Sequence, residues 1–261
     1  MRDTAAVLDA IAGPMPGDIF VAPAPHGPFC EEVGRDPGRL HVVLLLKDIL
    51  LDNPVHHECV EAVEHTGQVL ESLGHHVDVA HPPQLEGATG LGQALRIVST
   101  SNLAASLDRW SEAIGRPVTL EDVEQDTWER AEVGRGFSAV ELQQAVARLL
   151  NGAVRLPEWW MDGWDLLLTP TNSGPAPLVG EFAYGMEKRA ERTAAAFGLF
   201  TMPFSISGQP AISLPLHWTP AGLPIGVQAV ANYGREDTLI RVAAQLEETM
   251  PWKDRFPGLF G

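Results

Sequence analysis

The sequence predicts an α/β fold, a mixed β-sheet flanked by helices. Short apolar runs bounded by turn residues are typical of buried strands, and five occur, at residues 39–46, 77–80, 165–168, 211–216 and 225–230. The segments that follow several of these runs carry apolar residues at helical spacing, which is typical of helices packed on such a sheet. At least one edge of the sheet is expected to be exposed.

The first two strands are predicted to flank a helix. Asn53 and Pro54 form a typical helix start, with an N-cap and a proline in the first helical position. Apolar residues then recur until Leu73, and Gly74 is a typical C-cap.

The last two strands are predicted to lead into a terminal helix. Gly226 interrupts the second of them, which indicates a bulge or a close backbone approach. Glu236 and Asp237 complement the helix dipole in the first turn. The predicted buried face of this helix consists of Leu239, Ile240, Val242, Ala243 and Leu246.

The stretch 85–160 is predicted to be helical. Thr119-x-x-Asp122 and Ser138-x-x-Glu141 are similar to capping boxes, so each is expected to start a helix. The tryptophans at 159, 160 and 164 form either an aromatic recognition patch or, as is more common at the end of an amphipathic helix, part of the core.

The charge balance excludes several classes of partner. The formal net charge is −16 with only three lysines, Lys47, Lys188 and Lys253, which argues against binding to nucleic acid or to an anionic membrane. No apolar run has the length needed to cross a bilayer. Cys30 and Cys59 are too few for a disulfide framework, which favours a reducing, cytoplasmic setting.

The histidine pairs raise a metal hypothesis, which the pattern does not favour. Neighbouring residues on a strand face opposite sides, so His75 and His76 cannot readily share one ion. No cysteine or acidic ligand recurs at zinc-site spacing. These histidines and the pair His56 and His57 are therefore predicted to be exposed to solvent, and no metal site is expected.

Literal phrases identify a resemblance. T-M-P-F at 201–204, G-Q-P-A-I-S-L-P-L at 208–216, G-L-P-I-G-V-Q at 222–228 and Y-G-R-E-D at 233–237 resemble the closing segment of the amidase signature family. R-D-T-A-A at 2–6 and D-L-L-L-T-P-T at 165–171 resemble earlier parts of it. The resemblance implies one amidase-type domain over 1–261, with a helical insertion at 85–160 that covers the substrate pocket and a sheet with a terminal helix at 165–261.

The resemblance also implies a chemistry. Enzymes of this family hydrolyse carboxamide C–N bonds without a cofactor, using a nucleophilic serine, a relaying serine and a neutral lysine as base. The nucleophile lies in a glycine- and serine-rich loop. No such loop occurs in these 261 residues, and Lys47 is interpreted as a solvated strand end. The chain is therefore expected to be truncated and inactive alone, and none of its residues is assigned a catalytic role.

Four residues are expected to line the family's pocket: Thr169 and Thr171 at a strand end, and Thr201 and Phe204 in the T-x-P-F turn. In the glutaminase subunit of tRNA-dependent amidotransferases, an acid binds the glutamine amine two positions before the F-T-x-P motif. Gly198 occupies that position here, so the chain is more similar to general amidases and to nylon-oligomer cyclic dimer hydrolases.

Two functions stay open. One is an amidase that acts on a small amide substrate and needs a complementing N-terminal fragment. The other is a non-enzymatic remnant or interaction module that pairs with a separate N-terminal half. A G-G-S-S-G loop encoded upstream would favour the first. A homodimer is also left open. Strands 42–46 and 225–230 are expected to expose apolar faces, which would leave the chain marginally stable.

Overall fold

The computed structural model describes residues 1–261 except 20, 51, 87–89, 187–199 and 257–261. Its centre is the predicted mixed sheet, with strand order β2-β1-β3-β5-β4. The strands are β1 (His41–Leu44), β2 (His76–Val79), β3 (Leu166–Pro170), β4 (Ala211–Trp218) and β5 (Pro224–Val230). All five were predicted, with boundaries that differ by at most two residues.

The pairing of the strands explains which sequence segments meet. β1 is parallel to both β2 and β3, whereas β5 runs antiparallel between β3 and β4. Helix α2 (His57–Ser72) is the crossover between β1 and β2. Within the described sheet β2 and β4 are the outer strands, which confirms the predicted free edge.

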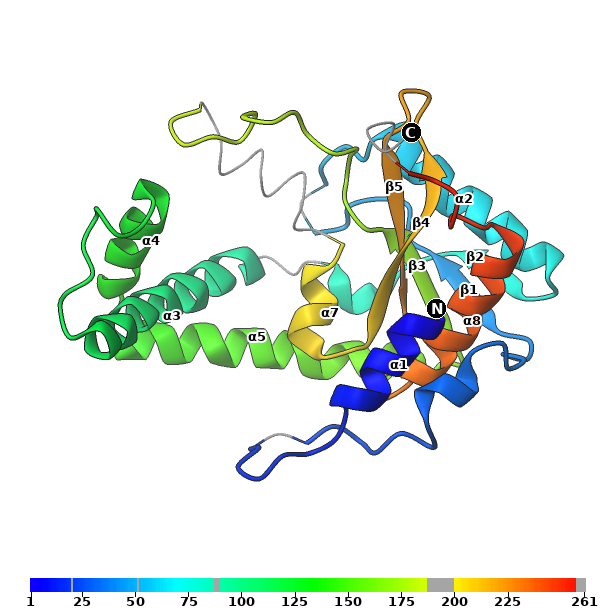
Figure 1. Ribbon diagram of the computed structural model, residues 1–261, viewed down its shortest axis with the longest axis horizontal. Helices are drawn as coiled ribbons and strands as arrows, with labels where there is room; N and C mark the ends of the chain where they lie inside the picture. Colours follow the sequence, from blue (N-terminus) through cyan, green and yellow to red (C-terminus); the bar gives the residue numbers. More distant parts are fainter. Residues whose placement is uncertain (20, 51, 87–89, 187–199, 257–261) are drawn as a thin grey trace.

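One face of the sheet is covered by α2 and by α8 (Glu236–Thr249), on the right of Figure 1. The strands alternate, so every second side chain enters this core. All five predicted α8 residues are buried. Ile240 packs with Ala5 and Phe29, whereas the other four pack with the following strand and α2 residues: Val42, Leu44, Val63, Leu70, Leu166, Leu168, Val227 and Ala229.

The other face is covered by the end of α5 (Ala139–Trp160), by α7 (Met202–Ser207) and by the short helix η2 (Pro83–Leu85). Trp159 and Trp160 are buried here, which confirms their interpretation as core residues.

The predicted helical stretch forms an arm that extends away from the sheet (Figure 1). Helix α3 (Leu91–Ile114) packs on α5, and helix α4 (Gln125–Arg135) packs on α3. Ser138 and Glu141 form the predicted capping box at the start of α5. The Tyr184 hydroxyl donates to Glu129 on α4, so the segment after β3 reaches this arm.

The predicted helix start at Thr119 was wrong. The Asp122 carboxylate accepts hydrogen bonds from the Thr119 N–H at 2.9 Å and from Arg116 at 2.7 and 2.8 Å. These contacts close a turn, and α4 begins only at Gln125.

The N-terminal helix α1 (Arg2–Ile11) and the short helix η1 (Phe29–Glu32) lie beside α8. The Asp9 carboxylate accepts from the backbone N–H of Phe29 at 2.6 Å and of Cys30 at 2.9 Å. Buried Glu32 accepts from Arg241 of α8 and, at 2.8 Å, from Arg35. The hydrogen bonds of exposed Asp9 and the ion pairs of buried Glu32 thus hold this segment in place.

Three further expectations were wrong. Helix α2 begins at His57, because the Asn53 N–H donates to Asp48 at 3.0 Å and belongs to the preceding loop. His75 is buried, since its Nδ1 accepts from the Leu40 N–H at 3.2 Å and its Nε2 contacts Gln245 at 3.0 Å.

The third correction concerns the two strands expected to be uncovered. The side chains of residues 42–45 are at most 5% exposed, and those of Ile225, Val227, Ala229 and Val230 at most 3%. Helices α2, α8, α5 and α7 cover both faces, so the predicted loss of burial does not occur there.

Candidate functional site

A row of polar side chains crosses three strands on the α7 face of the sheet. Thr169 of β3 is opposite Gln228 of β5, and Gln228 is opposite Ser213 of β4. Residues in register share a face. Leu167 and Val230, two register positions away and so on the same face, belong to the core against α7. The polar row therefore continues the surface on which α7 lies.

The buried half of the row fixes α7. The Gln228 amide Nε2 donates to Thr169 Oγ1 at 3.0 Å and to the Phe200 carbonyl at 2.9 Å. The Thr169 hydroxyl donates to the Pro170 carbonyl at 2.8 Å. Thr169 is completely buried and Gln228 is 4% exposed. Thr169 is therefore buried within the sheet, where it and Gln228 hold the segment that leads into α7.

At the Ser213 end of this row, the hydroxyl groups of Thr171 and Ser213 form a pair that solvent can reach. Thr171 Oγ1 and Ser213 Oγ lie 2.6 Å apart. Gly226 is in close contact with both hydroxyl groups. A Cβ added at Gly226 would be 2.7 Å from Ser213 Oγ and 2.8 Å from Thr171 Oγ1. Ser213 is exposed and Thr171 half-buried. This pair can donate to or accept from a group above the sheet.

Helix α7 carries the other two predicted residues. The Phe204 ring is 2% exposed and packs against Leu85 and other core residues. Thr201 is half-buried, and its carbonyl accepts from the Ser205 N–H at 3.1 Å. Phe204 borders a cavity of about 10 Å³, room for about one water molecule. A role in substrate binding stays a prediction for Thr169, Thr171, Thr201 and Phe204.

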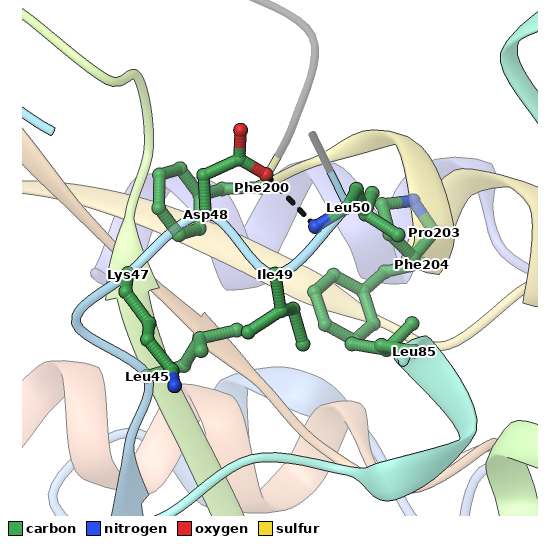
Figure 2. A pocket seen from close by; sticks show the side chains of 9 residues that line it. All are labelled: Leu45, Lys47, Asp48, Ile49, Leu50, Leu85, Phe200, Pro203 and Phe204. Carbon is green, nitrogen blue, oxygen red and sulfur yellow. Dashed lines mark hydrogen bonds between the residues drawn. The ribbon is translucent and has the colours of Figure 1, made fainter. Parts of the chain in front are cut away.

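The loop after β1 closes this small cavity (Figure 2). The buried Asp48 carboxylate accepts from the Leu50 N–H and the Asn53 N–H, both at 3.0 Å. Lys47 precedes it, and Figure 2 shows the Lys47 side chain turned away from the carboxylate.

Three serines in the short sequences Ser99-Thr-Ser101 and Ser205-Ile-Ser207 form hydrogen bonds with nearby carbonyl groups. Ser99 Oγ donates to the Arg96 carbonyl at 3.2 Å, Ser205 Oγ donates to the Thr201 carbonyl at 3.2 Å, and Ser207 Oγ donates to Gln209 Oε1. A serine needs an adjacent base to become nucleophilic, and within the described part of the chain none of these three hydroxyls is hydrogen-bonded to a lysine. Gly198 and Lys188 lie outside the described residues.

Of the polar side chains gathered here, Thr169 and Thr171 were among the four predicted residues, whereas Gln228 and Ser213 were missed. Thr169 and Thr171 share a face because they are two positions apart on a strand. Gln228 and Ser213 join them through the register of β4 and β5. The available signal was a single polar residue inside each of two otherwise apolar runs.

Two structural features bear on metals and membranes. Among the residues that the structure describes, no group of three or more His, Cys, Asp or Glu side chains is arranged to hold a metal ion. None of the described helices is both long and apolar enough to span a bilayer.

Known proteins match the chain along its whole length. The family model described as Amidase matches residues 1–240. The 6-aminohexanoate-cyclic-dimer hydrolase of Pseudomonas sp. (strain NK87) is 41% identical over 271 aligned residues, which cover 99% of this chain and 54% of the relative. The enzyme of that name from Paenarthrobacter ureafaciens is 40% identical with the same coverage. The chain thus spans about half the length of these curated relatives.

Solved structures agree. The structure of a 6-aminohexanoate cyclic dimer hydrolase matches with a TM-score of 0.92 and 38% identity, covering 100% of this chain and 55% of the other. A bacterial aryl acylamidase shares the fold alone, with a TM-score of 0.80 and 17% identity over 97% of this chain and 52% of the other. The predicted resemblance is confirmed: this chain belongs to the amidase family, also called the amidase signature family.

Proposed function

We propose that these 261 residues form one part of a carboxamide C–N hydrolase. We also propose that its nucleophile belongs to a polypeptide segment that these 261 residues do not include. The observation that carries the proposal is the match of the whole chain, at 41% identity, to about half of a cyclic amide hydrolase. The relatives therefore hold about as much chain again, and no serine–lysine arrangement characteristic of the family occurs in these 261 residues.

The chemistry proposed for the assembled enzyme follows the family. One serine attacks the amide carbonyl while a second serine relays its proton to a neutral lysine. The resulting acyl-enzyme is hydrolysed to a carboxylic acid, and the amine leaves. The proposed contribution of this chain is a pocket wall made of Thr171, Ser213 and α7, with Thr169 and Gln228 holding that wall in place.

The helical arm is proposed to cover this pocket, within a single amidase-type domain. Supporting this, the segment after β3 reaches α4 through the contact between Tyr184 and Glu129. The arm and the strand end that carries Thr171 are thereby tied together. The two free thiols, Cys30 and Cys59, favour a reducing cytoplasm as the setting.

The partner is proposed to be an N-terminal amidase fragment. The test mixes the purified chain with the separately expressed half of the Pseudomonas hydrolase that this chain does not cover. Primary amine released from 6-aminohexanoate cyclic dimer is then measured with an amine-reactive dye. We expect no release from either part and release from the mixture. A matched mixture whose fragment carries alanine at the serine nucleophile should stay silent.

Two outcomes would overturn the proposal. Turnover by the 261-residue chain alone, lost when one of its own serines is changed to alanine, would show that the nucleophile is present in it. A stable complex of the two parts without turnover would favour the non-enzymatic interaction module instead.

A further inference from the structure

A second, larger cleft lies at the end of β1 and shares Leu45 and Lys47 with the small cavity. It has a volume of about 560 Å³ and is lined by residues 44–47 at the end of β1, by residues 79–81 at the end of β2, and by Pro83 and Glu86. β1 and β2 are parallel, so the cleft lies at the carboxyl ends of neighbouring strands. Ligands of open α/β sheets commonly bind at such ends, and the volume suits a small molecule.

Most of the lining is aliphatic. Leu44, Leu45 and Leu46 come from β1 and the residue positions that follow it, and Val79 and Ala80 come from the end of β2. Val79 is 70% exposed although it belongs to a strand. Leu44 and Leu45 are already buried, so a ligand with a methylene chain would mainly cover Val79 and the half-buried Leu46 and Ala80. It would gain about 0.8 kcal/mol for each CH₂ group that it buries.

Three ionisable side chains complete the cleft. Lys47 is exposed and forms no ion pair with any described residue, in a chain whose formal net charge is −16. His81 Nε2 lies 2.6 Å from Glu86 Oε1, and the Glu86 side chain is 63% exposed. One cleft thus offers a cation for a carboxylate and a carboxylate for an ammonium group, with apolar surface in the same lining.

We propose that this cleft binds an unbranched ω-amino carboxylic acid, with its carboxylate on Lys47 and its ammonium group on Glu86. The inference rests on the proposed function. Hydrolysis of an amide built from such units breaks the C–N bond and adds water, which yields one carboxylate and one protonated amine on an open chain. Such a product carries both charges, with methylene groups between them that can contact the aliphatic lining.

The test measures binding to the purified 261-residue chain by calorimetry, with 6-aminohexanoate, hexanoate, hexylamine and hexanol as probes. 6-Aminohexanoate should bind more tightly than hexanoate or hexylamine. Lys47→Met should weaken 6-aminohexanoate and hexanoate about five-fold, the scale of one exposed ion pair, and leave hexylamine unchanged. Glu86→Gln should weaken 6-aminohexanoate and hexylamine and spare hexanoate. Lys253→Met removes another exposed lysine and should change nothing.

Equal affinity for hexanol and 6-aminohexanoate would overturn the proposal, as would binding that Lys47→Met leaves intact or no binding at millimolar probe. The two proposals fail separately. Turnover in the reconstituted mixture without binding here would refute only the cleft, whereas charge-selective binding without turnover would refute only the assignment as a hydrolase part.

Discussion

At the scale of single residues, the hydroxyl pair above Gly226 is the most constrained feature of the candidate site. Gly226→Ala would place a Cβ 2.7 Å from Ser213 Oγ, so a side chain or the strand must shift. We expect the free energy of unfolding to fall by about 1–3 kcal/mol, as for other overpacked positions. Urea denaturation measures this change.

A second variant identifies the cause. Ser213→Ala removes the clashing oxygen, so the double variant should recover part of the loss in a double-mutant cycle. Gly27→Ala, with no atom within 4 Å of the added Cβ, is the control and should change stability by less than about 1 kcal/mol. Strictly additive losses would show that the Ser213 hydroxyl is not the obstacle.

The sequence allowed part of this site to be predicted. Strand alternation was enough to place Thr169 and Thr171 on one face. The glycine inside the last strand was expected to mark a bulge or a close backbone approach. The register does shift opposite it, between Pro215 and His217, but the atoms that approach it closely belong to side chains. Gln228 and Ser213 could not be placed beside them, because the register between strands depends on packing that no local pattern reports.

At the scale of elements, α3 and α4 are packed through one glycine. A Cβ on Gly134 would lie 2.1 Å from the Thr100 carbonyl oxygen and 2.8 Å from the Ser101 nitrogen. Both are backbone atoms of α3, so the helices must separate. Gly134→Ala should lower the free energy of unfolding by about 1–3 kcal/mol, measured by urea denaturation.

The matched control is Gly92→Ala, also in a helix but with nothing within 4 Å of the new Cβ. Alanine favours helix formation over glycine by up to about 1 kcal/mol, so this variant should be as stable as the original chain or more so. Destabilisation of equal size by both variants would contradict the close contact between α3 and α4.

The attachment of η1 to α8 should depend on pH. Hydrogen bonding to the Arg241 guanidinium holds the pKa of the Glu32 carboxyl below its usual 4.5. A carboxyl with a depressed pKa in the folded state stabilises the fold above its unfolded pKa, and this contribution is lost as pH falls through the folded value. The effect should therefore be complete at neutral pH and fade below about 4.5.

The measurement compares Glu32→Gln with the original chain in urea at several pH values. At pH 7 we expect a loss of about 2 kcal/mol, the scale of a hydrogen bond to a charged group, and the difference should shrink in acid. Arg130→Met removes one member of an exposed pair, 4.0 Å from Asp126, and should cost less than about 1 kcal/mol. A difference that stays constant down to acid pH would refute the role of the Glu32 charge.

Helix types were easier to predict than helix starts. The apolar period of α8 and the capping box of α5 are local signals, and both were confirmed. The starts expected at Asn53 and Thr119 failed because Asp48 and Asp122 capture nearby backbone N–H groups and form turns. Such side-chain bonds compete with helix capping and cannot be ranked from the sequence pattern alone.

At the scale of the whole molecule, both sheet faces are covered by helices from these residues. Of the large apolar strand residues, Val79 of β2 is exposed. Other exposed apolar side chains lie on α1 and the segment after it, on the helical arm and on the segment after β3, and include Ile11, Met15, Trp110 and Leu178. The sequence could not reveal this, since burial of a strand depends on which helices cross it. The prediction of marginal stability therefore loses its stated cause.

The measurement that tests the central claim most directly is intact-mass analysis after treatment with a fluorophosphonate, which labels activated serines. The purified 261-residue chain should gain no adduct. Nucleophilic activation needs an adjacent base, and among the described residues the hydroxyls of Ser99, Ser205 and Ser207 are not hydrogen-bonded to a lysine. In the reconstituted mixture, one adduct should form on the complementing half. A stoichiometric adduct on a serine of the 261-residue chain by itself would contradict the claim that its nucleophile lies elsewhere.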